Sequence, residues 1–91
     1  MSLHKSNILT TAQNTLSTSA ELVIAARNER IYLKIHNAST DIAVYVGYDS
    51  GVTAATGHKI HFVSEFEMEG YVGPVYMIAA SGTPTVTYAE W

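Results

Sequence analysis

The sequence has 91 residues, a net charge of −3 and no cysteine. A chain of this length makes one domain, and without cysteine it has no disulfide bond, thiolate nucleophile or cysteine metal site. The acidic balance has the wrong sign for a nucleic-acid surface, and the apolar runs are too short to span a membrane. We therefore expect a small domain with no nucleic-acid and no membrane partner.

The N-terminal part of the chain is polar, and we expect residues 1–9 to form a flexible N-terminal arm that is too polar for a signal peptide. Residues 10–91 are expected to form a single β-sandwich domain. The segment at residues 20–26 contains Ala, Glu and Leu, which also suit a helix. We favour a strand there, because the β-branched Val23 and Ile24 fit a pleated surface better.

Further along the chain, apolar residues recur with a period of two, as in Ile31, Leu33 and Ile35, and this period is typical of strands. Turn residues such as Gly70 and Ser81-Gly82 separate the runs. The pattern predicts an all-β fold, an antiparallel β-sandwich that is jelly-roll-like and has about eight short strands. The expected strands lie near residues 10–16, 20–26, 30–36, 41–47, 58–63, 65–70, 74–79 and 85–91.

Histidines offer the first candidate chemistry, because His58 and His61 are close in sequence. Residues three apart on a strand point to opposite faces, so these two side chains cannot reach one ion unless the strand bulges. His36 or His4 would have to complete such a site. We interpret the histidines as polar residues at a strand edge and expect no metal.

Acidic residues offer two further candidates. Tyr48-Asp49-Ser50-Gly51 resembles part of a calcium loop, but the residues that follow lack the oxygen ligands and the final Glu of such a loop. We expect a turn in which Asp or Ser bonds to the backbone. Glu65, Glu67 and Glu69 share one strand face at a spacing of about 6–7 Å, which approaches the separation of glycosidase carboxylates. We favour charges that protect an edge strand, with a docking surface for a basic partner as an alternative.

Neither an enzyme site nor a cofactor site is predicted. No Ser lies in a Gly-x-Ser-x-Gly elbow, so we expect no catalytic, cofactor-binding or metal-binding residues. A row of tyrosines could stack on sugars, but we favour packing across strands with the hydroxyl groups at the rim. These tyrosines are Tyr32, Tyr45, Tyr76 and Tyr88. The loop 52–56 is small and apolar, and it is expected either to tuck against the domain or to insert into a partner.

Several strings resemble small virion proteins of tailed bacteriophages: Gly51-Val-Thr-Ala-Ala-Thr-Gly57, Gly70-Tyr-Val-Gly-Pro-Val-Tyr-Met-Ile-Ala-Ala-Ser-Gly82 and Thr85-Val-Thr-Tyr-Ala-Glu-Trp91. The resemblance covers Arg30 to Trp91, about two-thirds of the chain. The segment from His58 to Met68 departs from the pattern of these virion proteins. It carries His and Glu where they have a Pro- and Gly-rich stretch before the strand.

The resemblance implies a non-enzymatic structural β-sandwich protein located in the virion, such as a capsid decoration or cement protein, a head-fibre base or a tail-associated module. Its partners would be other virion proteins, either the major capsid protein or tail and fibre components. A homo-oligomer is expected, and a trimer is favoured because capsids offer threefold sites. The alternative is a carbohydrate- or receptor-binding β-sandwich module of a phage fibre or tail, or of a bacterial surface protein.

Overall fold

The structure is a computed structural model that describes residues 10–91, so the expected arm at residues 1–9 lies outside the described residues. The described residues form eight strands and no α-helix: β1 (Thr10–Thr15), β2 (Glu21–Ile24), β3 (Tyr32–Asn37), β4 (Val44–Gly47), β5 (His58–Ile60), β6 (Glu65–Glu69), β7 (Val75–Ala79) and β8 (Thr85–Glu90). The strand predicted near residues 20–26 is therefore confirmed, and its helical alternative is wrong. Among residues 10–91, no helix has the length and apolarity needed to span a membrane.

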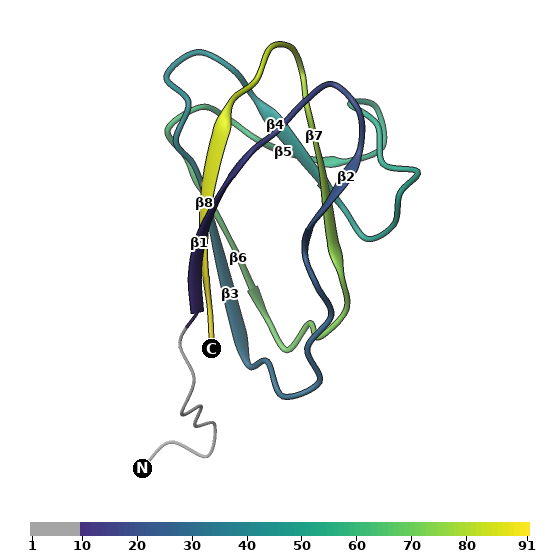
Figure 1. The fold of residues 1–91 in the computed structure, drawn as a ribbon, viewed down its shortest axis with the longest axis vertical. Coiled ribbons are helices and arrows are strands. Elements are labelled where there is room, and N and C mark those ends of the chain that lie inside the picture. Colours follow the sequence, from purple (N-terminus) through teal and green to yellow (C-terminus); the bar gives the residue numbers. More distant parts are fainter. Residues whose placement is uncertain (1–9) are drawn as a thin grey trace.

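The strands form two antiparallel sheets, with the orders β1-β8-β3-β6 and β2-β7-β4-β5 (Figure 1). Except at the β4–β5 hairpin, each strand is followed by a strand in the opposite sheet. This double-sheet order is that of a jelly roll. The predicted all-β sandwich is thus confirmed, including its jelly-roll character.

The core lies between the two sheets and follows from the alternation in the sequence. In β3, Leu33 and Ile35 are fully buried, whereas Tyr32 and Lys34, which alternate with them, point outward. β4 and β7 repeat this pattern, because successive side chains of a strand point to opposite faces. The buried apolar cluster is Leu16, Val23, Ile24, Leu33, Ile35, Val44, Val46, Ile60, Val75, Met77, Ala79 and Val86.

Several strands are shorter than predicted, because polar side chains hold the adjoining backbone in turns. The strand expected from residue 41 begins only at Val44. Before it, the Ser39 hydroxyl accepts hydrogen bonds from the amides of Asp41 and Ile42. The fully buried Asn37 closes this turn, since its side-chain amide donates to the carbonyl of Ile42 at 2.9 Å and to that of Ile60 at 3.1 Å.

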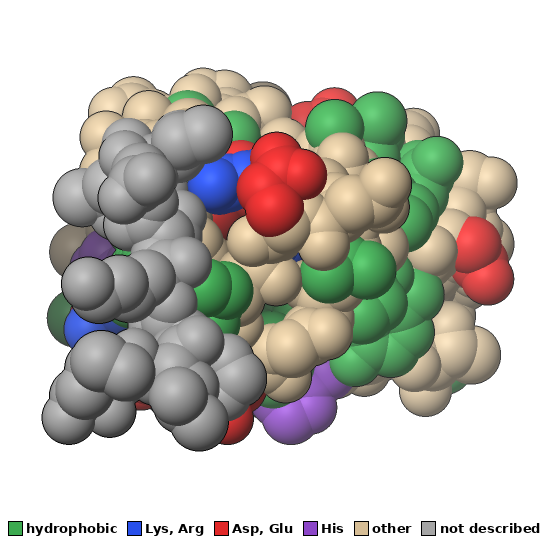
Figure 2. Space-filling view, turned by 90° about the horizontal axis from the view of Figure 1, so that it is seen from below, with side chains coloured by type: hydrophobic (Ala, Val, Ile, Leu, Met, Phe, Trp, Pro, Cys, Tyr) green, Lys and Arg blue, Asp and Glu red, His purple; other side chains and the backbone are tan. Residues whose placement is uncertain are grey.

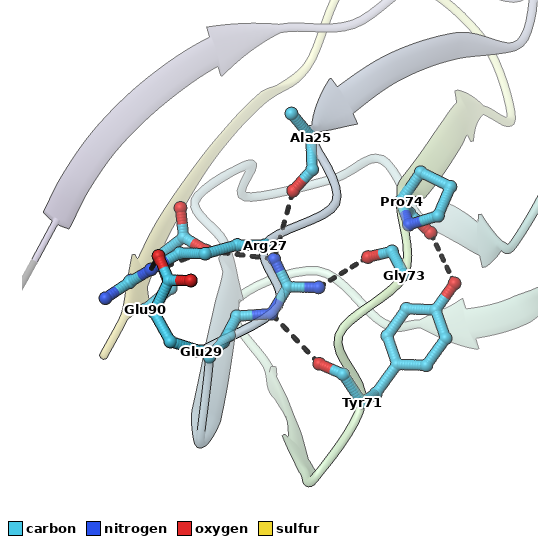
Figure 3. A network of polar contacts seen from close by, with 8 residues as sticks. Ala25, Arg27, Glu29, Tyr71, Gly73, Pro74 and Glu90 are labelled. Atoms are coloured by element: carbon cyan, nitrogen blue, oxygen red, sulfur yellow. Dashed lines mark hydrogen bonds and ion pairs between the residues drawn. The ribbon is translucent and has the colours of Figure 1, made fainter. Parts of the chain in front are cut away.

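A buried arginine joins the β2–β3 loop, the β6–β7 loop and the last residue of β8 at one end of the sandwich (Figure 3). The side chain of Arg30 is fully buried, and its Nη1 lies 2.9 Å from Oε1 of Glu90. The guanidinium also donates to the carbonyl oxygens of Ala25, Tyr71 and Gly73. A buried cation is tolerated only when it is paired and hydrogen-bonded, and Arg30 satisfies both conditions.

Candidate functional site

The predicted histidine candidates lie apart. His36 is on the outer surface of β3, whereas His58 belongs to β5 in the other sheet. His58 and His61 each pack against an aromatic ring in a tilted arrangement. The ring centroids lie 4.4 Å apart for His58 and Phe66, and 3.9 Å apart for His61 and Phe62. Within residues 10–91, no three His, Cys, Asp or Glu side chains gather as a metal site requires. His4 lies outside the described residues.

The loop between β4 and β5 is held by its own hydrogen bonds. Oδ1 of Asp49 accepts the amide of Gly51 at 2.8 Å, which confirms the predicted turn. Val52 is buried, while residues 53–56 are exposed. Within the predicted loop 52–56, only Val52 therefore tucks against the domain. The side chain of Val52 fits against Gly47 and Gly57, which leave the space that it fills. A groove of about 620 Å³ opens beside this loop.

The outer surface of the β1-β8-β3-β6 sheet is polar, and we call it the polar face. It carries Thr11, Gln13, Thr15, Tyr32, Lys34, His36, Glu65, Glu67, Glu69, Thr85, Thr87 and Ala89. A groove of about 620 Å³ on this face is lined by Thr11, Gln13, Lys34, His36, Glu65 and Thr87, among others. His58 lines the groove on the other sheet, so it does not converge with Glu65, Glu67 and Glu69.

The acidic residues of β6 lie on an edge strand, as predicted. They pair with β3, where Lys34 Nζ lies 3.4 Å from Oε1 of Glu65 and the Tyr32 hydroxyl donates to Glu67. The hydrogen bond to Glu67 is the main cause that raises the pKa of Tyr32 above its ordinary value. These carboxylates therefore have neighbours on β3 and charge the edge of the sheet.

The tyrosines that could have formed a sugar-stacking row lie on different parts of the molecule. Tyr32 is on the polar face and stacks with Trp91 at 4.9 Å between ring centroids. Tyr88 packs against the core, and burial raises its pKa. Tyr45 and Tyr76 lie on the outer surface of the opposite sheet. A single tyrosine row is therefore not formed.

The outer surface of the β2-β7-β4-β5 sheet is the most distinctive surface of the described chain. Leu22 of β2 pairs with Tyr76 of β7, and Ile78 of β7 pairs with Tyr45 of β4. Leu22 is 50% exposed, and the other three are half-buried. We call these four residues the apolar face. Lys59, opposite Tyr45, stands at its border.

Alternation predicts which residues share a strand face, but not which face stays uncovered. Both surfaces of this sheet are rich in apolar residues: Val44 and Val46 point inward, and Tyr45 points outward. A strand with apolar residues on both faces is typical of burial on both sides. The apolar face therefore places apolar side chains of three strands, β2, β7 and β4, at the surface of the described residues.

A second group of exposed apolar residues lies in the loops, and sequence reasoning missed it. Tyr48 is 56% exposed and stacks with Tyr71 at 5.0 Å between ring centroids. Tyr71 is anchored by donating to the carbonyl of Pro74 at 2.6 Å, and burial raises its pKa. Phe62, Val63 and Val72 are exposed in other loops. Hydrophobic side chains gather on the right of the view from below (Figure 2).

Neither the protein-family models nor the curated proteins contain a match to the chain. Two solved structures are similar to the chain. One comes from Bacillus endospore appendages, described as a novel family of disulfide-linked pili; it is 16% identical, has a TM-score of 0.57, and the match covers 92% of this chain and 84% of that one.

The other is Aeromonas hydrophila PliG, a periplasmic inhibitor of g-type lysozyme, which is 9% identical with a TM-score of 0.41 over 90% of this chain and 83% of that one. At 16% identity, the likeness to the appendage protein establishes a shared fold alone. The resemblance to phage virion proteins is not tested by these comparisons and stays a prediction.

Proposed function

We propose that the chain is a non-enzymatic structural protein of a tailed-phage virion, and that it decorates or cements the capsid through the apolar face. The observation that carries this proposal is the exposure of Leu22 beside Tyr76, Tyr45 and Ile78 on the outer surface of one sheet. Contiguous apolar surface of this kind marks a site of protein–protein contact.

The composition of the apolar face suits an interface. Aromatic residues dominate binding energy when they lie near the centre of a contact, and Tyr45 and Tyr76 lie on the two middle strands of this sheet. Charged residues are sparse at interface cores, and Lys59 stands at the border of the face. A stable contact buries about 800 Å² on each partner, so neighbouring loop residues such as Tyr48 would contribute as well.

The fold supports a role in assembly. Jelly rolls occur in viral capsid proteins and in lectins, and one solved structure with this fold comes from a pilus. The assignment to a phage rests on the resemblance of the segment from Arg30 to Trp91 to virion proteins. The partners that we propose are other virion proteins, foremost the major capsid protein, with further copies of this chain. The trimer expected from the sequence stays a prediction, and the dimer inferred below competes with it.

Binding to undecorated capsids tests the proposal. Leu22→Lys and Tyr76→Lys place a charge on the apolar face, and we expect each to reduce co-sedimentation with capsids at least about tenfold, since a lone charge is costly to bury in an interface. Glu69→Lys introduces the same side chain on the exposed edge of the polar face and should leave binding intact. Melting curves identify variants that fail to fold. Equal losses in all three folded variants would contradict the proposal.

The neighbouring genes test whether the chain belongs to the capsid or to a tail fibre. A major capsid gene beside the gene for this chain supports decoration. A tail-fibre gene in that place supports a receptor-binding module instead.

A further inference from the structure

An exposed edge strand can pair with another chain, and native sheets protect their edges with charges, bulges or short strands. Three of the four edges in the described residues are protected in these ways. β6 carries three glutamates, Glu65, Glu67 and Glu69. β5 has three residues and includes Lys59. β2 has four residues and an irregular register between Leu22 and Ile24.

The remaining edge, β1, has none of these protections. Its six residues, Thr-Thr-Ala-Gln-Asn-Thr, include no charge and no proline. Its register with β8 is continuous, from Thr10 opposite Glu90 to Thr15 opposite Thr85. Within residues 10–91, no strand pairs with its other side. A regular and uncharged edge of this length is suited to accept another strand.

The hydrogen bonds at the end of β1 show which backbone groups face outward. The amide of Leu16 donates to the carbonyl of Pro84 at 2.8 Å, so Leu16 is in a hydrogen-bonded pair with the chain leading into β8. In an antiparallel ladder, hydrogen-bonded and non-hydrogen-bonded residues alternate. Asn14 and Ala12 therefore bond to β8, while the backbone groups of Thr11, Gln13 and Thr15 point toward the free edge.

We infer that this edge pairs with β1 of a second copy, antiparallel and about a two-fold axis, so that the sheets of two copies form one continuous sheet. The inference rests on the proposed assembly function, but it names a surface other than the apolar face. When Gln13 lies opposite its own counterpart, Thr11 lies opposite Thr15, and every outward amide and carbonyl group of these residues meets a partner. The facing side chains are uncharged, so no like charges oppose each other.

The mass of the full chain in solution, measured by sedimentation at several concentrations, tests this pairing. Gln13→Pro removes an outward amide and leaves the bonds to β8 in place, and proline is tolerated on edge strands. We expect the wild type to be a dimer and Gln13→Pro to be a monomer. Gln13→Lys should also dissociate the dimer, and it serves if the proline variant does not fold. Thr87→Lys, on the adjacent strand β8 and the same face, should remain dimeric.

A monomeric wild type would overturn the inference, as would a trimer or a dimer that survives both Gln13 variants. Capsid binding separates this inference from the proposed function. Dimers that need β1 but do not bind capsids would refute the function alone. Monomers that bind capsids through the apolar face would refute the pairing alone.

Discussion

Nη1 of Arg30 lies 2.9 Å from Oε1 of Glu90, although the two residues are 60 positions apart in the sequence. The contact connects the loop before β3 to the last residue of β8. Because Arg30 also donates to the carbonyls of Tyr71 and Gly73, it fixes the connection between β6 and β7 as well. One side chain therefore ties three distant segments together at one end of the sandwich.

Removal of Glu90 should destabilise the domain strongly. Glu90→Ala leaves the buried guanidinium of Arg30 without its charged partner, and breaking such a pair costs about 3–5 kcal/mol of unfolding free energy. Urea denaturation measures the loss. Glu29→Ala is the matched control, because Glu29 is 68% exposed where it pairs with Arg27, and exposed pairs contribute about 0–1 kcal/mol. Equal losses in the two variants would contradict the assigned role of Arg30.

Gly47 should be required because a larger side chain would clash with its neighbours, and not because its backbone needs a conformation that favours glycine. A Cβ at this position would lie 2.5 Å from Cβ and 2.5 Å from Cγ2 of Val52, and Val52→Ala removes the second of these two contacts. Gly47→Ala should therefore cost about 1–3 kcal/mol through overpacking, and Val52→Ala in the same chain should recover part of that loss in a double-mutant cycle.

Gly70 provides the comparison for this cycle. It has φ = +80° and no atom within 4 Å of an added Cβ. Gly70→Ala should cost about 1–2 kcal/mol through backbone strain, and Val52→Ala should not relieve that cost. If Val52→Ala relieves neither glycine variant, the explanation for Gly47 is wrong.

Tyr32 should ionise at unusually high pH because its hydroxyl donates to Glu67, and this bond raises its pKa. The neutral phenol is the form that bonds, so its contribution to stability is complete below about pH 10, the ordinary pKa of tyrosine, and is lost as the pH rises through the raised pKa. NMR titration of the Tyr32 ring should show a lower pKa in Glu67→Gln. Glu69 acts on Tyr32 through its charge alone, so Glu69→Gln should lower the pKa less. The reverse order would refute the assigned hydrogen bond.

The sequence pattern predicted the strands well, because alternation directly reports which residues face the core. Leu33 and Ile35 illustrate this, since both are fully buried as their spacing requires. Strand ends were less predictable, because side-chain hydrogen bonds set them: Ser39 holds a local turn by accepting the amide of Ile42, and Asn37 donates to the carbonyl of Ile60, a contact over 23 residues of sequence. Contacts between residues far apart in the sequence, such as Arg30 with Glu90, could not be predicted because no pattern of neighbouring residues indicates them.

The candidate surface was also missed, for a related reason. Apolar residues on both faces of β4 and β7 indicate burial on both sides, but they do not reveal whether the same chain or a partner covers the second side. Only the arrangement of the two sheets shows that Leu22, Tyr76 and Tyr45 remain outside. An edge strand such as β1 likewise becomes visible as an edge only when the strand order is known.

The most direct measurement of the central claim compares two lysines on opposite sides of the sandwich. Lys59 borders the apolar face, and Lys34 lies on the polar face. Amine-reactive labelling is followed by mass spectrometry, with and without capsids. The account predicts that capsid binding protects Lys59 and leaves Lys34 reactive. Protection of Lys34 with Lys59 still reactive would contradict the account.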